Sequence, residues 1–353
     1  MKTIFGSRKD HYPIRLSVFL IMAALIAGMV GCDGDDGYNP PPTQNLKIRN
    51  WSDLDAVRGN LTGSYVLMND LDSATPGYEE LASPSANQGK GWEPIGWGYW
   101  VSTWFGAKEV GEIFKGSFDG QGYEIRDLYI NRDGGLVGLF GFVSKGGIIT
   151  GGGIIKNVAL INATVTIGET AGGPVGLHED TVKCLDVGTV DAVGRLVGYN
   201  GGTVSNCYAT GNVTGGWNVG GLVGRNDGTV SNCYAMGNVT GDWDVGGLAG
   251  SNWGTVRNSY STCSVNGKSD VSGLVGYNTG TVSNSFWDTE TSGQFTSDGG
   301  TGETTAEMKS IATFSGAGWN ITAVADSDAR NPSYIWNMVD GQIYPFMSWQ
   351  PAS

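Results

Sequence analysis

The chain has 353 residues, of which 59 are Gly, and only 16% are charged. The Gly content is more than twice the usual level of about 7%, but Gly does not recur at every third position, which excludes collagen. A hydrophobic share of 40% argues against a disordered chain. The net charge of −13, without a basic stripe, argues against nucleic-acid binding. This composition is typical of many short strands joined by tight turns.

Residues 1–31 have the features of an export signal. Basic residues precede an apolar run from Leu16 to Val30, which is shorter than the roughly 20 residues that a membrane-spanning helix needs. The ending MVGC resembles the lipobox of bacterial lipoproteins, and this resemblance implies lipid attachment at Cys32. Secretion without a lipid and an uncleaved anchor are the alternatives. Either way, we expect the rest of the chain to lie outside the cytoplasm.

The next two segments predict a tether and an N-terminal cap. Residues 32–45 are acidic and then Pro-rich, which is typical of a flexible tether. Residues 46–112 are expected to form the cap and the first strands. Within them, Ser52 is expected to begin a short helix as its N-cap, and YVLMNDL to form the first strand.

A group of aromatic residues follows in GWEPIGWGYWVSTWF (91–105). It contains the tryptophans Trp92, Trp97, Trp100 and Trp104. Such a group can form a carbohydrate-binding platform, or it can pack in the core of the N-terminal cap. The sequence leaves both interpretations open.

Residues 113–296 contain a repeat with a strict period of 26 residues. Four clean copies begin at Val193, Val219, Val245 and Val271, and degenerate copies span 114–130, 135–168 and 172–192. A fixed period indicates a solenoid or a propeller, but propeller blades need about 40–45 residues. The Gly content of each copy excludes helical repeats. We therefore predict an all-β fold, a right-handed parallel β-helix with short helical and strand caps at both ends.

Stacked coils place equivalent residues about 4.8 Å apart, so each repeated position predicts a column. The valines expected to fill the interior are Val204, Val230, Val256, Val282, Val213, Val239 and Val265. An asparagine column, Asn206, Asn232, Asn258 and Asn284, is expected at a bend, because Asn tolerates left-handed backbone geometry. Gly is expected where the chain turns a corner.

The sequence GGLVG and its variants GRLVG, GGLAG and SGLVG, followed by GTVSN, resemble the GLUG motif repeats of bacterial and archaeal surface proteins. The resemblance covers roughly 114–287 and implies a fold and a surface location, not a reaction. Some streptococcal IgA-cleaving metallopeptidases carry the motif beside a separate catalytic domain. Here His178 has no second histidine to complete an H-E-x-x-H zinc helix, which excludes that activity.

A second column along the repeat is aromatic. It consists of Tyr208, Tyr234, Tyr260 and Phe286. By alternation with inward neighbours it faces out of the coil, where the rings can bind sugar or a partner surface. The alternative is cross-strand stacking beneath a loop.

Neither the cysteines nor any sequence motif indicates a catalytic or metal-binding site. Cys207 and Cys233 are equivalent positions of adjacent coils, and we favour buried thiols over a disulfide because Ser259 and Ser285 occupy the same column. No G-x-S-x-G or C-x-x-C is present. We expect no catalytic residues, no metal and no cofactor.

The C-terminal cap, residues 297–353, is expected to contain a short helix in 304–314 and two strands around an Asp340–Gly341 turn. Together these features predict a lipid-anchored cell-surface module with a structural or adhesive role. Its partners would be the membrane, through the lipid at Cys32, and a surface polysaccharide or protein, but not nucleic acid. The alternative is a carbohydrate-active enzyme, a polysaccharide lyase or hydrolase, because such enzymes share the β-helix fold.

Overall fold

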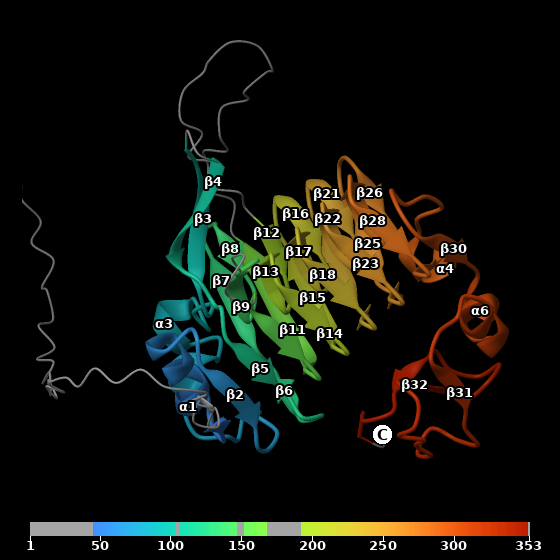
Figure 1. Cartoon of the computed structure of the whole chain (residues 1–353), viewed down its shortest axis with the longest axis horizontal. Helices are drawn as coiled ribbons and strands as arrows, with labels where there is room; N and C mark the ends of the chain where they lie inside the picture. The colour runs from blue at the N-terminus through green and yellow to red at the C-terminus, as the bar shows by residue number, and fades with distance from the viewer. Residues whose placement is uncertain (1–44, 104–105, 147–151, 168–191, 352–353) are drawn as a thin grey trace, which may run out of the picture. The chain divides into compact units, whose positions relative to one another are not determined.

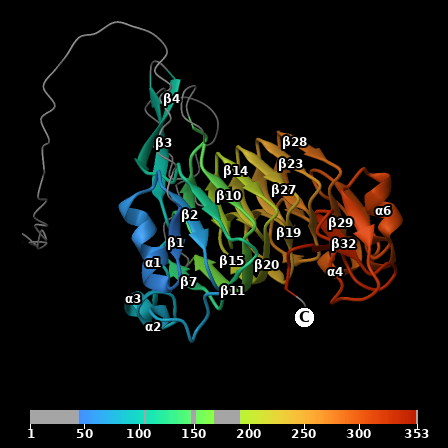
Figure 2. The ribbon, with the colours of Figure 1, turned by 60° about the horizontal axis from the view of Figure 1, so that its bottom comes forward.

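The computed structural model describes residues 45–103, 106–146, 152–167 and 192–351. The predicted export signal, nearly all of the tether and the degenerate copy at 172–192 lie outside these residues. The described residues form a parallel β-helix, in which successive coils add one rung to each of several sheets (Figures 1 and 2). The predicted fold class is therefore confirmed.

Four sheets run along the solenoid. Sheet I has eight parallel strands in the order β1 (Leu46–Ile48), β2 (Ser64–Leu67), β5 (Ser117–Asp119), β10 (Ile154–Lys156), β14 (Thr203–Ser205), β18 (Thr229–Ser231), β23 (Thr255–Arg257) and β28 (Thr281–Ser283). Sheet II has ten strands, which are β6 (Glu124–Arg126), β7 (Tyr129–Arg132), β11 (Ala159–Ile167), β15 (Tyr208–Thr214), β19 (Tyr234–Ala235), β20 (Asn238–Thr240), β24 (Tyr260–Ser261), β25 (Ser264–Asn266), β29 (Phe286–Asp288) and β30 (Thr301–Glu303).

Sheets III and IV carry the GLVG segments. Sheet III consists of β8 (Leu136–Val137), β12 (Ala192–Gly194), β16 (Trp217–Gly220), β21 (Trp243–Gly246) and β26 (Val271–Ser272). Sheet IV consists of β9 (Phe140–Val143), β13 (Val197–Asn200), β17 (Val223–Asn226), β22 (Ala249–Asn252) and β27 (Val275–Asn278). Each clean copy thus contributes strands to sheets III, IV, I and II in turn.

Equivalent residues stack in register, as the period predicts. Val204 pairs with Val230, and Val230 with Val256, in successive strands of sheet I. The Leu222 amide donates to the Leu248 carbonyl at 2.9 Å, one coil further along. The predicted interior valines belong to one continuous core inside the coil together with Leu196, Leu222, Leu248 and Leu274, and all are buried except Val282, which is partly buried.

Two asparagine columns mark bends of the coil. The predicted column has positive φ at every clean copy, from 46° at Asn284 to 52° at Asn206. A second column, not predicted, is buried, and its amides form a ladder: Asn200 Nδ2 donates to Asn226 Oδ1 at 2.7 Å, and Asn226 Nδ2 to Asn252 Oδ1 at 2.7 Å. Each buried amide therefore has the hydrogen-bond partner that burial of a polar group requires.

The glycines of the GLVG segments serve close packing as well as turns. Gly221 lies in the bend between β16 and β17, as expected of a glycine at a corner, whereas Gly220 and Gly224 lie in these strands and are not among the glycines with positive φ. An ideal Cβ at Gly220 would lie 1.9 Å from Val223 O and 2.8 Å from Ala249 Cα. Sheet III therefore packs backbone against backbone on sheet IV of the next coil, at a distance that only glycine allows.

One copy has an arginine at the inward-facing glycine position that follows Gly220 in the repeat. Arg195 stands where the later copies have Gly221 and Gly247, and its side chain is fully buried inside the coil. Its guanidinium donates to the carbonyls of Gly221 at 2.9 Å and Gly211 at 2.8 Å. Burial lowers the pKa of Arg195, and the nearby Cys263 thiol acts in the opposite direction.

The N-terminal cap contains α1 (Trp51–Asp55), η1 (Ala56–Gly59), α2 (Tyr78–Leu81) and α3 (Ala86–Gly89), followed by the antiparallel pair β3 (Trp97–Thr103) and β4 (Gly106–Glu112). Asn50, not Ser52, is the N-cap of α1, and its Oδ1 accepts from the Asp53 amide at 2.8 Å. The helix begins earlier than predicted because Trp51 belongs to its first turn, where the ring is fully buried. The predicted first strand is β2, which follows β1.

After the short helix α4 (Thr289–Ser292), which follows β29, the C-terminal cap contains α5 (Thr305–Met308), α6 (Ile311–Gly316), β31 (Ile321–Ala323), β32 (Trp336–Met338) and β33 (Phe346–Met347). The single helix predicted over 304–314 is two helices, of which α5 starts with a capping box between Thr304 and Glu307. The predicted antiparallel pair around Asp340–Gly341 is confirmed as β32 and β33. No helix in the described part of the chain has the length and apolar run that crossing a membrane requires.

The close packing of sheets III and IV predicts that one added methyl group at Gly220 lowers the stability of the fold strongly. Gly220→Ala forces the new Cβ against Val223 O and Gly250 N, so we expect the free energy of unfolding to fall by about 2–3 kcal/mol. Gly216→Ala is the matched control in the same coil, because nothing lies within 4 Å of its ideal Cβ. Its effect should stay within about 0.5 kcal/mol. Equal urea midpoints for the two variants would contradict this account.

Candidate functional site

The predicted aromatic column is a continuous stack of rings. The centroids of Tyr208 and Tyr234 lie 4.7 Å apart with an interplanar angle of 3°, and those of Tyr234 and Tyr260 lie 5.0 Å apart at 7°. Phe286 is in register with Tyr260. These rings belong to a cluster separate from the coil interior, so they point out of the coil as the alternation predicts.

The stacked rings are not exposed, and the expectation of an accessible ring platform is wrong. None of the four is more than 6% exposed, because the C-terminal cap covers them. Tyr234 Oη donates to Gln350 Oε1 at 2.9 Å, and Tyr260 Oη donates to Pro345 O at 2.6 Å. The cap thereby removes from water a strip of rings that the coil alone leaves uncovered. Stacking beneath a covering segment, the second interpretation, describes the column.

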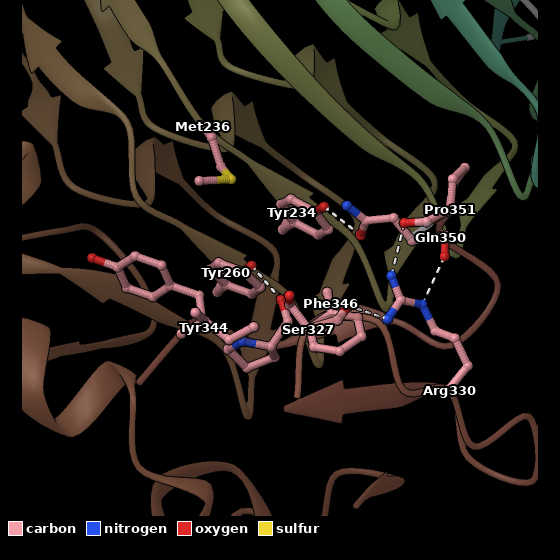
Figure 3. A pocket seen from close by; sticks show the side chains of 11 residues that line it. Tyr234, Met236, Tyr260, Ser327, Arg330, Tyr344, Phe346, Gln350 and Pro351 are labelled. Atoms are coloured by element: carbon pink, nitrogen blue, oxygen red, sulfur yellow. Dashed lines mark hydrogen bonds between the residues drawn. The ribbon is translucent and has the colours of Figure 1, made fainter. Parts of the chain in front are cut away.

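A hollow of about 300 Å³ remains along the seam between the column and the cap (Figure 3). Its walls include Tyr234, Met236, Tyr260, Tyr344 and Phe346. At one side, Arg330 Nε donates to Gln350 O at 2.7 Å and Nη2 donates to Pro351 O at 2.7 Å (Figure 3). Because backbone carbonyls engage this guanidinium, the hollow presents mainly apolar ring surface.

The predicted tryptophan group does not form one platform in the described residues. Trp92 is fully buried, 5.8 Å from the Trp51 ring, and its Nε1 donates to Leu139 O at 3.2 Å. Trp97 is 56% exposed and lines a hollow of about 470 Å³. Trp100 lies in β3, but its side chain and the whole of Trp104 are outside the described residues. Core packing therefore holds for Trp92, while Trp97 remains accessible.

The cysteines in the repeat are buried free thiols. This applies to Cys207, Cys233 and Cys263, while Cys184 and the predicted lipidation residue Cys32 lie outside the described residues. Burial raises the pKa of the Cys207 thiol, with the neighbouring Cys233 acting in the same direction. An inaccessible thiol is a poor nucleophile, so these buried cysteines have a packing role.

A partly exposed cluster that the sequence did not reveal lies at the edge of sheet IV, where Trp253 and Tyr277 are exposed and Tyr199 is buried. We call it the flank cluster: Tyr199, Arg225, Asp227, Trp253 and Tyr277. Arg225 Nε donates to Asp227 Oδ1 at 2.9 Å, and Tyr199 Oη donates to Asp227 Oδ2 at 2.7 Å. The Arg225 guanidinium carbon lies 4.8 Å from the Trp253 ring centroid, within cation–π range. The ion pair of Arg225 and Asp227 in one coil thus lies beside the exposed rings of Trp253 and Tyr277 in the next two coils.

A shallow groove of about 420 Å³ lies beside this cluster, where the chain passes from sheet IV to sheet I. We call it the flank groove. Its walls include Asp227, Lys145 and the threonines Thr203, Thr229 and Thr255, which are in register across adjacent strands. The groove therefore offers a ladder of hydroxyl-bearing residues with one carboxylate and one amine at its sides.

A further pair of exposed rings lies on sheet III. Trp217 and Trp243 stack with their centroids 5.2 Å apart and an interplanar angle of 11°. Both are more than 40% exposed. The next rung of this column is Ser269, so the stack ends at Trp243.

Comparison with known proteins identifies the repeat. Residues 192–214 and 215–240 match the family model of the GLUG motif. The chain carries GLUG motifs. These two GLUG repeats supply β12 to β20 and contain Tyr199, Arg225 and Asp227, which are three of the five residues of the flank cluster.

Two further likenesses extend beyond the matched GLUG repeats. Over 177 residues, 49% of the chain, it is 35% identical to halomucin of Haloquadratum walsbyi, and this region spans 2% of halomucin's length. The structure is also similar to a crystal structure of a candidate immunoglobulin A1 protease from Bacteroides ovatus. That match has a TM-score of 0.43 and 19% identity, and covers 70% of this chain and 67% of the other.

Sequence reasoning missed the flank cluster for a specific reason. Asp227 and Trp253 are equivalent positions of neighbouring copies, as are Tyr199, Arg225 and Tyr277, but the residue type changes from copy to copy, so no repeated residue marks either column. The Trp217–Trp243 stack had a usable signal, because the two residues are 26 apart and flank the same Gly-rich bend. The register rule that located the tyrosine column applies equally to them.

The buried tyrosine stack predicts alkaline instability. Burial raises the pKa of Tyr208, Tyr234 and Tyr260 above the ordinary value of about 10. Above pH 10 the folded state therefore holds protons that the unfolded chain loses, so the free energy of unfolding falls as the pH rises. Denaturation at a series of pH values should show this decline, with a shallower slope in Tyr234→Phe. Identical slopes in the variant and the wild type would contradict the assignment.

Proposed function

We propose that this chain is an exported, lipid-anchored cell-surface module with a structural or adhesive role. In this proposal it binds glycan or protein ligands along the flank of its coil and catalyses no reaction. The observation that carries the proposal is the flank cluster. Its exposed rings and paired charges lie beside an open groove rather than in an enclosed pocket. Exposed aromatic patches of this kind are typical of interaction surfaces.

The chemistry around the flank groove supports binding over catalysis. Hydrolysis of a glycosidic bond normally uses two carboxyl groups about 5–9.5 Å apart. Among the described residues that line the groove, Asp227 is the one carboxylate, and it is engaged by Arg225 and Tyr199. A carboxylate held in this way is suited to fixing a side chain or a ligand hydroxyl, not to proton transfer.

The GLUG repeats and the export signal support the location. The GLUG motif resembles repeats of bacterial and archaeal surface proteins, and the chain is similar over half its length to halomucin. The apolar run before MVGC and the acidic, Pro-rich segment after it fit a lipid anchor followed by a tether.

The anchor is tested at Cys32. Cys32→Ser removes the thiol to which the lipid would be attached, so the variant should lose radiolabelled palmitate and leave the membrane fraction or remain as the uncleaved precursor. The full chain is expressed in a bacterium that processes lipoproteins, and fractions are compared by blotting. A wild-type chain without label, or a variant that keeps it, would exclude this anchor.

The binding role is tested with the exported protein on arrays of glycans and of extracellular proteins. We expect binding to at least one class, reduced about tenfold or more by Trp253→Ala, and no shortening of any bound polymer. Trp97→Ala is the control, because that ring is equally accessible but lies on β3. Absence of binding to every spot would refute the adhesive role, and shortened polymer would favour the enzyme.

A further inference from the structure

We propose that the outer edge shared by sheets III and IV binds a neutral glycan chain that lies along the coil axis. We call this surface the aromatic edge and define it by Trp217, Trp243, Trp253 and Tyr277. The inference rests on the proposed binding function and adds the chemical class of the ligand and its docking place.

The two rows of rings lie on the two sides of one edge. An ideal Cβ at Gly250 would lie 2.3 Å from the carbonyl carbon of Asn218, and one at Gly220 would lie 2.8 Å from Ala249 Cα. The strands β16 and β22 are therefore in contact and run in opposite directions. Ser251 Oγ donates to Asn218 Oδ1 at 2.6 Å across this contact. The start of β16, with Trp217, thus lies beside the end of β22, which precedes Trp253.

The four rings of the aromatic edge are accessible, whereas the C-terminal cap covers the tyrosine column of the same coil. All four are 40–50% exposed, whereas the stacked tyrosines are at most 3% exposed. Indole and phenol rings stack on the apolar C–H faces of pyranose rings. Because Ser269 replaces a third tryptophan, the stack leaves one indole face of Trp243 without an aromatic neighbour. A sugar ring can occupy the place of that missing rung.

Polar groups flank the rings in a pattern that suits hydroxyl groups. Arg225 is paired with Asp227 next to Trp253, and Lys268 Nζ lies 2.8 Å from Asp242 Oδ1 next to Trp243. Each pair presents a donor and an acceptor within reach of one ligand. Sugars use vicinal hydroxyls in this double role, as donors to a carboxylate and acceptors from a cation.

The charge distribution favours a neutral ligand over an anionic one. Asp244 and Asp270 of the sheet III side lie near Asp298, which hydrogen-bonds to β27 of sheet IV, and burial and these two carboxylates raise the pKa of Asp244. The chain as a whole carries a net charge of −13. An acidic polysaccharide would be repelled by this side of the edge, whereas a neutral polymer is not.

The test is affinity electrophoresis of the protein, exported from cells that express the full chain, in native gels. One set of gels contains dextran, hydroxyethyl cellulose or galactomannan, and a second contains alginate or hyaluronan. We expect retardation by at least one neutral polymer, a loss of affinity of about tenfold or more in Trp243→Ala and Trp253→Ala, and none in Trp97→Ala. Trp253→Tyr keeps an aromatic ring and should retain most of the retardation.

Several results would overturn the inference. These are no retardation by any neutral polymer, retardation by the acidic polymers alone, and equal losses in Trp97→Ala and Trp253→Ala. A thermal melt of each variant identifies any loss that is due to unfolding. If array binding to a protein depends on Trp253 while no neutral polymer retards the chain, the glycan inference fails and the proposed adhesive function stands.

Discussion

The solenoid depends on in-register stacking of parallel strands, which puts every repeated side chain about 4.8 Å from its copy in the next coil. A column must therefore consist of side chains that can pack, stack or hydrogen-bond against an identical side chain. Valine and leucine meet this condition by packing, and tyrosine meets it by ring stacking at 4.7 Å. Asparagine meets it because its amide is both donor and acceptor, so Asn200, Asn226 and Asn252 can be buried without an unpaired group.

The second constraint is space between sheets III and IV. Their backbones touch through glycines such as Gly220 and Gly250, so a side chain at these positions would collide with the next coil. The next glycine of the repeat, Gly221, faces the coil interior instead, and there the first clean copy carries Arg195. Its side chain extends along the axis, where Gly221 lacks a side chain, and reaches Cys263 Sγ at 3.9 Å two coils further on. Buried guanidinium is costly without partners, and here backbone carbonyls from successive coils supply them.

The period makes the columns and the strand order predictable, because in-register stacking converts sequence spacing directly into geometry. The N-cap at Asn50 was missed because Ser52 and Asp55 repeat the capping pattern of Asn50 and Asp53 two residues later, and only the burial of Trp51 decides between the two starts. The cover over the tyrosine column could not be predicted, because the C-terminal cap does not repeat and its contact with Tyr234 joins residues 116 apart. The same holds for Arg225 and Trp253, whose contact comes from non-equivalent positions of neighbouring coils.

In such a fold, binding residues are best sought in columns whose residue type changes from coil to coil. An interior column tolerates a deviating side chain only where the neighbouring coils make room for it, as the glycines do for Arg195, because a deviation otherwise leaves a void or a clash. An outward column has no such requirement, and its members can differ from coil to coil. The column after the buried asparagines reads Gly201, Asp227, Trp253 and Thr279, and the one before them reads Tyr199, Arg225, Ser251 and Tyr277. These two variable columns form the flank cluster. The uniform asparagine ladder beside them fixes the position of their side chains, but in-register stacking does not determine which residues they contain.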